Sequence, residues 1–144
     1  MKGPKDLYVN IFNELIPFNK HLGLKLSELT EGFAKATIAF KPELVGDSRI
    51  LAVHGGVISA AMDAVGGIAG ITTLHSIEDK IVTVDMRVDY IRSARNTGLI
   101  IEARIVRSGN RIITTNMQVF AENDGTLVAE GRGVYHVSRK KKEE

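Results

Sequence analysis

A single carboxylate, Asp63, interrupts a run of apolar and small residues that extends from Val53 to Gly70. An ionised carboxylate in such surroundings is costly unless it is paired or performs chemistry, and titratable groups held in this way cluster at functional sites. Asp63 is therefore the first candidate catalytic residue. The competing interpretation makes it a structural carboxylate that caps or bridges a contact between subunits. Three histidines outside this run lie too far apart in the sequence to indicate a metal site: His21, His75 and His136. No metal ligand and no cofactor are therefore expected.

The run that contains Asp63 predicts a long helix from about Gly55 to Leu74. Its residues are apolar or small on every side, which is typical of a helix surrounded by other elements. A membrane-spanning interpretation of residues 51–74 is disfavoured because a carboxylate at the centre would cost a few kcal/mol. Nearer the N-terminus, apolar residues at helical spacing predict an amphipathic surface helix from Lys5 to about Lys20, ending near Pro17.

Alternating apolar and polar residues predict strands on both sides of the long helix. A hairpin covers Leu22 to Phe40. After the helix, Val82 to Tyr90 alternates most clearly, and the pattern puts Thr83 with Asp85 on the face away from the core. Turn residues separate three further strands, which with this one predict a four-stranded antiparallel meander: Leu99–Arg107, Ile112–Ala121 and Leu127–Val137. A sheet of about six antiparallel strands should curl around the central helix, giving an α+β fold.

Length and composition limit the classes of protein. The 144 residues, 44% of them hydrophobic, predict one domain over residues 1–144, with an N-terminal helix in 1–20 and a charged tail in 138–144. A net charge of +2 argues against a dedicated nucleic-acid binder. The absence of cysteine excludes disulfides and a thiolate nucleophile. No secretory signal is visible at the N-terminus, so we expect a cytoplasmic protein.

Several short motifs follow one another in a characteristic order: His54-Gly55-Gly56, Asp63 nine positions after the histidine, Thr83-Val84-Asp85-Met86, Tyr90-Ile91-Arg92-Ser93-Ala94, and Gly125 to Gly131. Together they resemble the hotdog-fold acyl-CoA thioesterases of the PaaI-like, phenylacetate-pathway type. The resemblance covers roughly Leu22 to Val137. It implies the hotdog fold, in which the antiparallel sheet wraps around one long helix.

The resemblance also implies an activity and roles for individual residues. The protein would hydrolyse a fatty or aromatic acyl-CoA to the free acid and CoA, with Asp63 as the nucleophile or as the general base that activates water. The amide of Gly55, alone or with that of Gly56, would donate to the oxyanion at the helix N-terminus. Thr83 falls where relatives hold the lytic water with a serine or threonine. For His54 we favour a hydrogen-bonding scaffold over an acid or base.

Simple geometry adds a constraint on this site. If Gly55 and Asp63 lie on one helix, eight residues at 1.5 Å rise separate them by roughly 12 Å. One thioester carbonyl cannot reach both groups. We therefore expect Gly55 of one subunit to act with Asp63 of another, as in a two-fold dimer with antiparallel central helices. Members of the resembled family build their sites between subunits and pair dimers into tetramers. Gly66, Gly67 and Gly70 would permit tight packing along the same helix.

Substrate-binding residues are harder to assign. Many relatives have an asparagine or glutamine, six residues before the histidine, that helps to hold the thioester. In this chain Ser48, Asp47 or Arg49 replaces it, or the contact is missing. The CoA phosphates need cations, and the candidates stand at strand ends and turns: Arg92 with Ser93, Arg107, the turn of Gly109, Asn110 and Arg111, and the cluster from Arg139 to Lys142. The acyl pocket is predicted near Met62, Phe12 and Phe18.

Two other functions compete with hydrolysis. One is a non-catalytic hotdog module that binds acyl-CoA as a sensor, although the short N-terminal segment leaves little room for the usual DNA-binding extension. The other is a hotdog dehydratase. Its usual histidine and partner carboxylate are not matched, because two glycines follow His54 and the carboxylate comes nine residues later. The thioesterase interpretation leads.

Overall fold

The computed structural model describes residue 1 and residues 3–141, so the last three residues of the expected charged tail lie outside the described residues. The elements follow in the order α1 (Lys5–Asn10), η1 (Ile11–Leu15), α2 (Pro17–Leu22), β1 (Leu24–Thr30), β2 (Phe33–Ile38), η2 (Pro42–Leu44), β3 (Val45–Asp47), β4 (Ala52–Val53), α3 (Gly55–Ile71), β5 (Lys80–Tyr90), β6 (Leu99–Ser108), β7 (Ile112–Ala121) and β8 (Leu127–Ser138).

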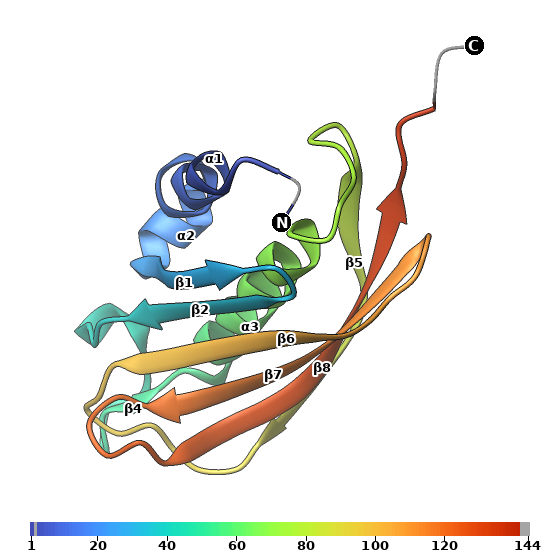
Figure 1. Ribbon diagram of the computed structural model, residues 1–144. Coiled ribbons are helices and arrows are strands. Elements are labelled where there is room, and N and C mark those ends of the chain that lie inside the picture. Colours follow the sequence, from blue (N-terminus) through green and yellow to red (C-terminus); the bar gives the residue numbers. More distant parts are fainter. Residues whose placement is uncertain (2, 142–144) are drawn as a thin grey trace.

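Six antiparallel strands form one sheet in the order β1-β2-β6-β7-β8-β5, and the sheet curls around α3 (Figure 1). The predicted α+β architecture, the hotdog fold, is therefore confirmed. A second sheet holds only β3 and β4, next to the start of α3. No helix among the described residues is long and apolar enough to cross a membrane.

The core lies between α3 and the inner face of the sheet. Ala61, Met62, Val65 and Ala69 of α3 are fully buried, and they pack with sheet residues such as Ile101. This burial explains why the helix is apolar on nearly every side.

The glycines of α3 allow the helix to approach its own sheet closely. A Cβ on Gly66 would clash with the Tyr135 hydroxyl and lie 2.8 Å from the Met117 sulfur, and one on Gly70 would lie 2.7 Å from Cδ1 of Ile81. Gly67 has more space, since its nearest neighbour would be at 3.8 Å. Tight packing at Gly66 and Gly70 is confirmed, and it is packing within one chain.

The predicted four-stranded meander is wrong for its first strand. β6, β7 and β8 do form a meander, but β5 pairs with β8 at the sheet edge, whereas β6 pairs with β2. The segment 91–98 between β5 and β6 is longer than the two to about five residues of a hairpin loop. Its backbone groups bond elsewhere: Ile91 N–H donates to Val128 O at 2.9 Å and Ala94 O accepts from Val53 N–H at 2.9 Å. The segment therefore passes the ends of β8 and β7 before the chain enters β6 (Figure 1).

The N-terminal helix also differs from the prediction. Helical backbone runs from Lys5 to Leu15, Ile16 is extended, and Pro17 begins α2 instead of ending the segment. Proline suits the first helical position because its missing N–H has no acceptor there. The segment lies beside β1 at the sheet edge (Figure 1). Phe12 is 1% exposed in the core.

Candidate active site

Asp63 lies in the middle of α3, half-buried, with its side chain directed at β5. The Thr83 hydroxyl donates a hydrogen bond to Oδ1 of Asp63 at 2.7 Å. The Tyr135 hydroxyl, from β8, donates to the main-chain carbonyl of Asp63 at 3.1 Å. Burial, and then the negative charge of Asp63, raise the pKa of Tyr135, so its phenol is a neutral donor across the ordinary pH range. Three elements thus fix the position of one carboxylate.

Thr83 faces the helix, so the prediction that it shares a face with Asp85 away from the core is wrong. Thr83 is opposite Tyr135 and Asp85 is opposite the next residue, Val134, so Val84 is an extra residue in β5. Such a β-bulge reverses the alternation and re-aims a side chain. Val82 and Val84, expected on the core face, are 57% and 55% exposed. The bulge is what brings Thr83 to Asp63.

His54 caps the N-terminus of α3. Its Nδ1 accepts a hydrogen bond from the Gly56 N–H at 2.8 Å, which satisfies one of the free amides of the first turn. This contact agrees with the scaffold interpretation of His54. It also engages the Gly56 amide, so only the Gly55 N–H, the first of the helix, has no acceptor among the described residues.

Tyr90 closes one side of the helix N-terminus. Its hydroxyl donates to the Gly55 carbonyl at 3.1 Å, and a Cβ on Gly55 would lie 3.2 Å from the Tyr90 ring. A hollow of about 300 Å³ lies beside Gly55 and is lined by Ala52, Val53, Gly55, Ile58, Tyr90, Ile91, Arg92, Ser93 and Ala94. The structure therefore brings Arg92 and Ser93, two predicted binding residues, to the predicted oxyanion donor.

Comparison with known proteins identifies the family. The sequence model of the thioesterase superfamily matches residues 52–128, the part that contains α3 and the strands β5, β6 and β7. The chain belongs to the thioesterase superfamily. The enzyme class that the motifs implied, a thioester hydrolase, is confirmed at the level of this family.

Individual relatives agree with the family. The chain is 30% identical to the medium/long-chain acyl-CoA thioesterase YigI of Salmonella typhimurium over 85% of this chain and 86% of that protein. A crystal structure of a thioesterase-superfamily protein from Shewanella oneidensis is 30% identical, covers 92% of this chain and 94% of that one, and has a TM-score of 0.84. The PaaI protein of Escherichia coli shares the fold at 20% identity, with 88% and 87% covered and a TM-score of 0.78.

The other predicted binding residues of this superfamily member lie elsewhere. Asn110 and Arg139 line a second hollow of about 670 Å³ with His75, Ser76, Asp79, Lys140 and Lys141. Arg139 donates to Asn110 O at 3.1 Å and pairs with Asp79 at 3.2 Å. The backbone N–H of Lys140, and then the Arg139 side chain, hold the pKa of Asp79 below its usual range. Gly109 and Arg111 belong to the adjacent β6–β7 turn, where the Gly109 N–H donates to Ile112 O.

These two hollows lie at opposite ends of α3. The first adjoins Gly55, while Ser108 near the second bonds Thr73 just beyond the last turn. The 17 residues of α3 span about 25 Å, so a single chain does not bring Arg92 and Arg139 together.

Ser48 and the residues of the predicted acyl pocket do not line the hollow beside Gly55. Ser48 is exposed in the turn between β3 and β4, and the neighbouring Asp47 and Arg49 pair with each other at 2.8 Å. Met62 is buried in the core, and Phe18 is 56% exposed on α2. Neither lines the hollow beside Gly55, because Met62 faces the sheet and α2 lies at the opposite sheet edge from β5.

Sequence reasoning missed Tyr135 as part of the site. The only signal for it was its alternation within the β8 pattern, which it shares with every inward residue of that strand. Tyr90 was part of a quoted motif, but the motif gave no reason to expect its bond to Gly55.

Proposed function

We propose that the protein hydrolyses acyl-CoA thioesters, with Asp63 as nucleophile or general base. The observation that carries the proposal is the Thr83–Asp63 hydrogen bond in the middle of an otherwise apolar helix of a thioesterase-superfamily member. The Salmonella relative, named a medium/long-chain acyl-CoA thioesterase, supports the substrate class. A cytoplasmic location stays a prediction.

The chemistry follows from the two oxygens of Asp63. Thr83 occupies Oδ1, which leaves Oδ2 to accept a proton from water or to attack the thioester carbon. In the first route hydroxide adds to the carbonyl, and the C–S bond then breaks as the thiolate of CoA takes a proton. In the second route Oδ2 bonds to the acyl carbon, the C–S bond breaks and the CoA thiolate leaves, and water then hydrolyses the anhydride formed with Asp63. In both routes the Gly55 N–H donates to the oxyanion.

The proposed site is shared between two subunits. Gly55 and Asp63 both belong to α3, so the separation of about 12 Å applies within one chain. β5 is an edge strand with one unpaired side, and the exposed Val82 and Val84 lie on it. A two-fold dimer along this edge would cover them and bring the Gly55 end of one α3 toward Asp63 of the other. We include a homodimer, paired into a homotetramer, in the proposal.

For substrate binding we propose Arg92 and Ser93 beside Gly55 as contacts for CoA. Arg92 is exposed and is one of the residues that line the hollow, and a guanidinium there suits a phosphate. Asn110 and Arg139 would contact the nucleotide end only from another subunit, because they lie at the far end of α3.

The test is release of free thiol from a panel of short, medium, long and aromatic acyl-CoAs. Activity on at least one of them is expected, and Asp63→Asn should lower kcat by about 10²–10⁴-fold. Asp85→Asn is the matched control, since Asp85 is exposed two residues from Thr83 and faces away from α3. Acyl-CoA binding without thiol release would favour the sensor alternative. Near-normal turnover in Asp63→Asn would remove Asp63 from the mechanism.

A further inference from the structure

The peptide between Gly55 and Gly56, at the start of α3, is held at both of its polar ends. Its C=O, which belongs to Gly55, accepts a hydrogen bond from the Tyr90 hydroxyl at 3.1 Å. Its N–H, which belongs to Gly56, donates to Nδ1 of His54 at 2.8 Å. The bond to His54 closes a ring of atoms that contains the Gly55 N–H, and the bond to Tyr90 attaches this ring to β5. We call these two hydrogen bonds the clamp.

The two glycines make the clamp both necessary and sterically possible. Two consecutive glycines have more backbone freedom than any other residue pair, so an N–H between them is poorly oriented unless something holds it. A Cβ on Gly56 would lie 2.9 Å from His54 Nδ1, and one on Gly55 would lie 3.2 Å from the Tyr90 ring. The missing side chains therefore let His54 and Tyr90 reach the peptide, and their hydrogen bonds restrict the freedom that the glycines introduce.

The sheet holds Tyr90 in place. Tyr90 is the last residue of β5 and is opposite Ala129 of β8. The next two N–H groups, those of Ile91 and Arg92, both donate to the Val128 carbonyl, at 2.9 and 3.2 Å. A hydroxyl on such a rigid strand end can position the start of α3, because supporting groups are precise only when they are fixed themselves.

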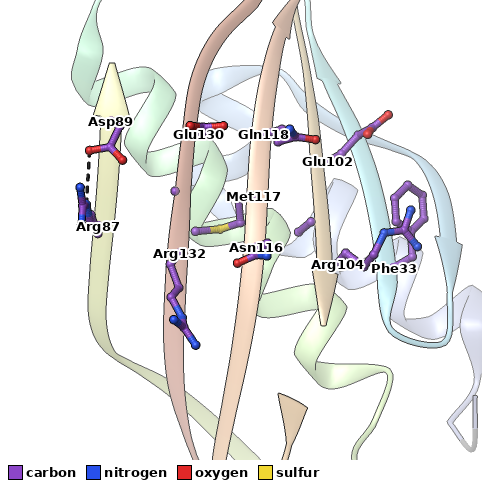
Figure 2. Close-up of a pocket in the computed structure, with 12 residues that line it drawn as sticks. Phe33, Arg87, Asp89, Glu102, Arg104, Asn116, Met117, Gln118, Glu130 and Arg132 are labelled. Atoms are coloured by element: carbon purple, nitrogen blue, oxygen red, sulfur yellow. Dashed lines mark hydrogen bonds and ion pairs between the residues drawn. The ribbon is translucent and has the colours of Figure 1, made fainter. Parts of the chain in front are cut away.

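The bulge in β5 also determines where Tyr90 points. Arg87 and Asp89 pair at 3.3 Å on the face of the sheet away from α3, so the residue after Asp89 turns toward the helix (Figure 2). Thr83 faces the helix as well, although an odd number of residues separates it from Tyr90. Regular alternation would put the two side chains on opposite faces, and the extra residue Val84 removes this conflict. One strand thus supports both functional parts of α3.

We propose that Tyr90 is a positioning residue for the oxyanion donor and acts through the Gly55–Gly56 peptide. This inference rests on the proposed function, because it assigns a role in the same site. A donor that is already oriented when the substrate arrives needs no reorganisation during the reaction. Loss of the Tyr90 hydroxyl should therefore weaken an interaction made only in the transition state, which lowers kcat and leaves KM unchanged.

The competing interpretation is a direct contact between Tyr90 and the substrate. Tyr90 lines the hollow beside Gly55 and is 55% exposed, so its ring is accessible there. Its hydroxyl, in contrast, is engaged by the Gly55 carbonyl. Tyr90→Phe separates the two roles, because a contact of the ring survives in this variant and the hydrogen bond to Gly55 does not.

The kinetic experiment measures thiol release by Tyr90→Phe in three backgrounds. In the wild-type background kcat should fall about 3–10-fold, the effect of one lost hydrogen bond, with KM unchanged. In Gly55→Pro the donor is already missing, so Tyr90→Phe should have no further effect. In Gly55→Ala, which adds a Cβ at the same place but keeps the N–H, the 3–10-fold effect should persist. Tyr8→Phe removes a hydroxyl from α1, outside the lining of the hollow, and should keep the wild-type kcat.

A second measurement follows the clamp without any chemistry. The amide hydrogen of Gly56 is protected by its bond to His54, and its exchange with solvent can be followed by NMR in the full chain. Loss of the Tyr90 hydroxyl should make this exchange about 3–10-fold faster, because one of the two bonds that hold the peptide is gone. The amides in the middle of α3 should exchange as in the wild type, which excludes general destabilisation.

The proposal is overturned if Tyr90→Phe keeps the wild-type kcat, or if it changes KM instead. It is also overturned if the loss is the same in Gly55→Pro, or if the Gly56 amide exchanges at the wild-type rate. A wild-type chain that releases no thiol from any acyl-CoA would refute the proposed function. The exchange of the Gly56 amide then still decides whether Tyr90 orients the peptide, so the two failures are distinguishable.

Discussion

A mixture of two inactive variants should recover activity if Gly55 and Asp63 act across subunits. The first variant is Asp63→Asn. The second is Gly55→Pro, which removes the N–H while keeping the helix start, because proline is favoured at the first helical position. His54 already has φ −59° and ψ 134°, the extended conformation that a residue before proline adopts. The variant thus removes one donor with little change in the backbone.

The expected loss of activity follows from the missing hydrogen-bond donor, and the expected recovery follows from the number of intact sites in a mixed dimer. Loss of the oxyanion donor should lower kcat by about 10²–10³-fold in Gly55→Pro. In a mixed dimer one site combines Gly55 of the Asp63→Asn chain with Asp63 of the Gly55→Pro chain, so it is intact, and the other site has both defects. Random 1:1 exchange makes half of the dimers mixed, so the mixture should show about a quarter of wild-type activity.

The assay is thiol release after the two purified variants have been unfolded together and refolded, with each variant refolded alone as the baseline. Gly55→Ala is the control for crowding at Tyr90, since it adds a Cβ at the same position but keeps the N–H. It should lose much less activity than Gly55→Pro. If the refolded mixture only matched the mean of the separate variants, although mass measurements showed mixed dimers, the shared-site reasoning would be refuted.

Three further predictions test other contacts. Thr83→Val should lower kcat by about 10-fold or more because Asp63 loses a charged hydrogen bond. Thr83→Ser keeps the hydroxyl and should retain most of the wild-type kcat. Steady-state kinetics of both variants test this prediction. Gly66→Ala should destabilise the fold by about 1–3 kcal/mol in urea unfolding because the added Cβ meets Tyr135 and Met117. Gly67→Ala is the control and should be neutral or stabilising, because the nearest atom to its added Cβ would be 3.8 Å away. Equal urea midpoints for the two variants would contradict this prediction. The pKa of Asp79 is lower in the folded protein than in the unfolded chain. The ionised carboxylate therefore stabilises the fold at a pH above its unfolded pKa of about 3.9, and this stabilisation is lost as the pH falls through the pKa of the folded state. Urea midpoints of wild type and Asp79→Asn should therefore differ at pH 7 and converge in acid.

The helix and the strands were predictable because their patterns are local. The all-apolar α3 and the alternation in β6, β7 and β8 required a sheet wrapped around a helix. The place of β5 was not predictable in this way, since strand order depends on where the segment 91–98 bonds. The bulge at Val84 was hidden for a similar reason: Val82, Thr83 and Val84 are all β-branched, and such residues fit either face of a strand. Only the pairing with β8 shows which residue is extra.

The bulge links the proposed chemistry to the proposed dimer. Without it, regular alternation would turn Thr83 outward, and Asp63 would lose its hydrogen-bond donor. Val82 and Val84, next to and at the bulge, are exposed on the edge strand β5, and the proposed dimer would remove their apolar surface from water. One extra residue thus aims Thr83 at the carboxylate and leaves an edge that favours a partner. In the proposed mechanism, the Gly55 amide that Asp63 cannot reach in its own chain would come from that partner.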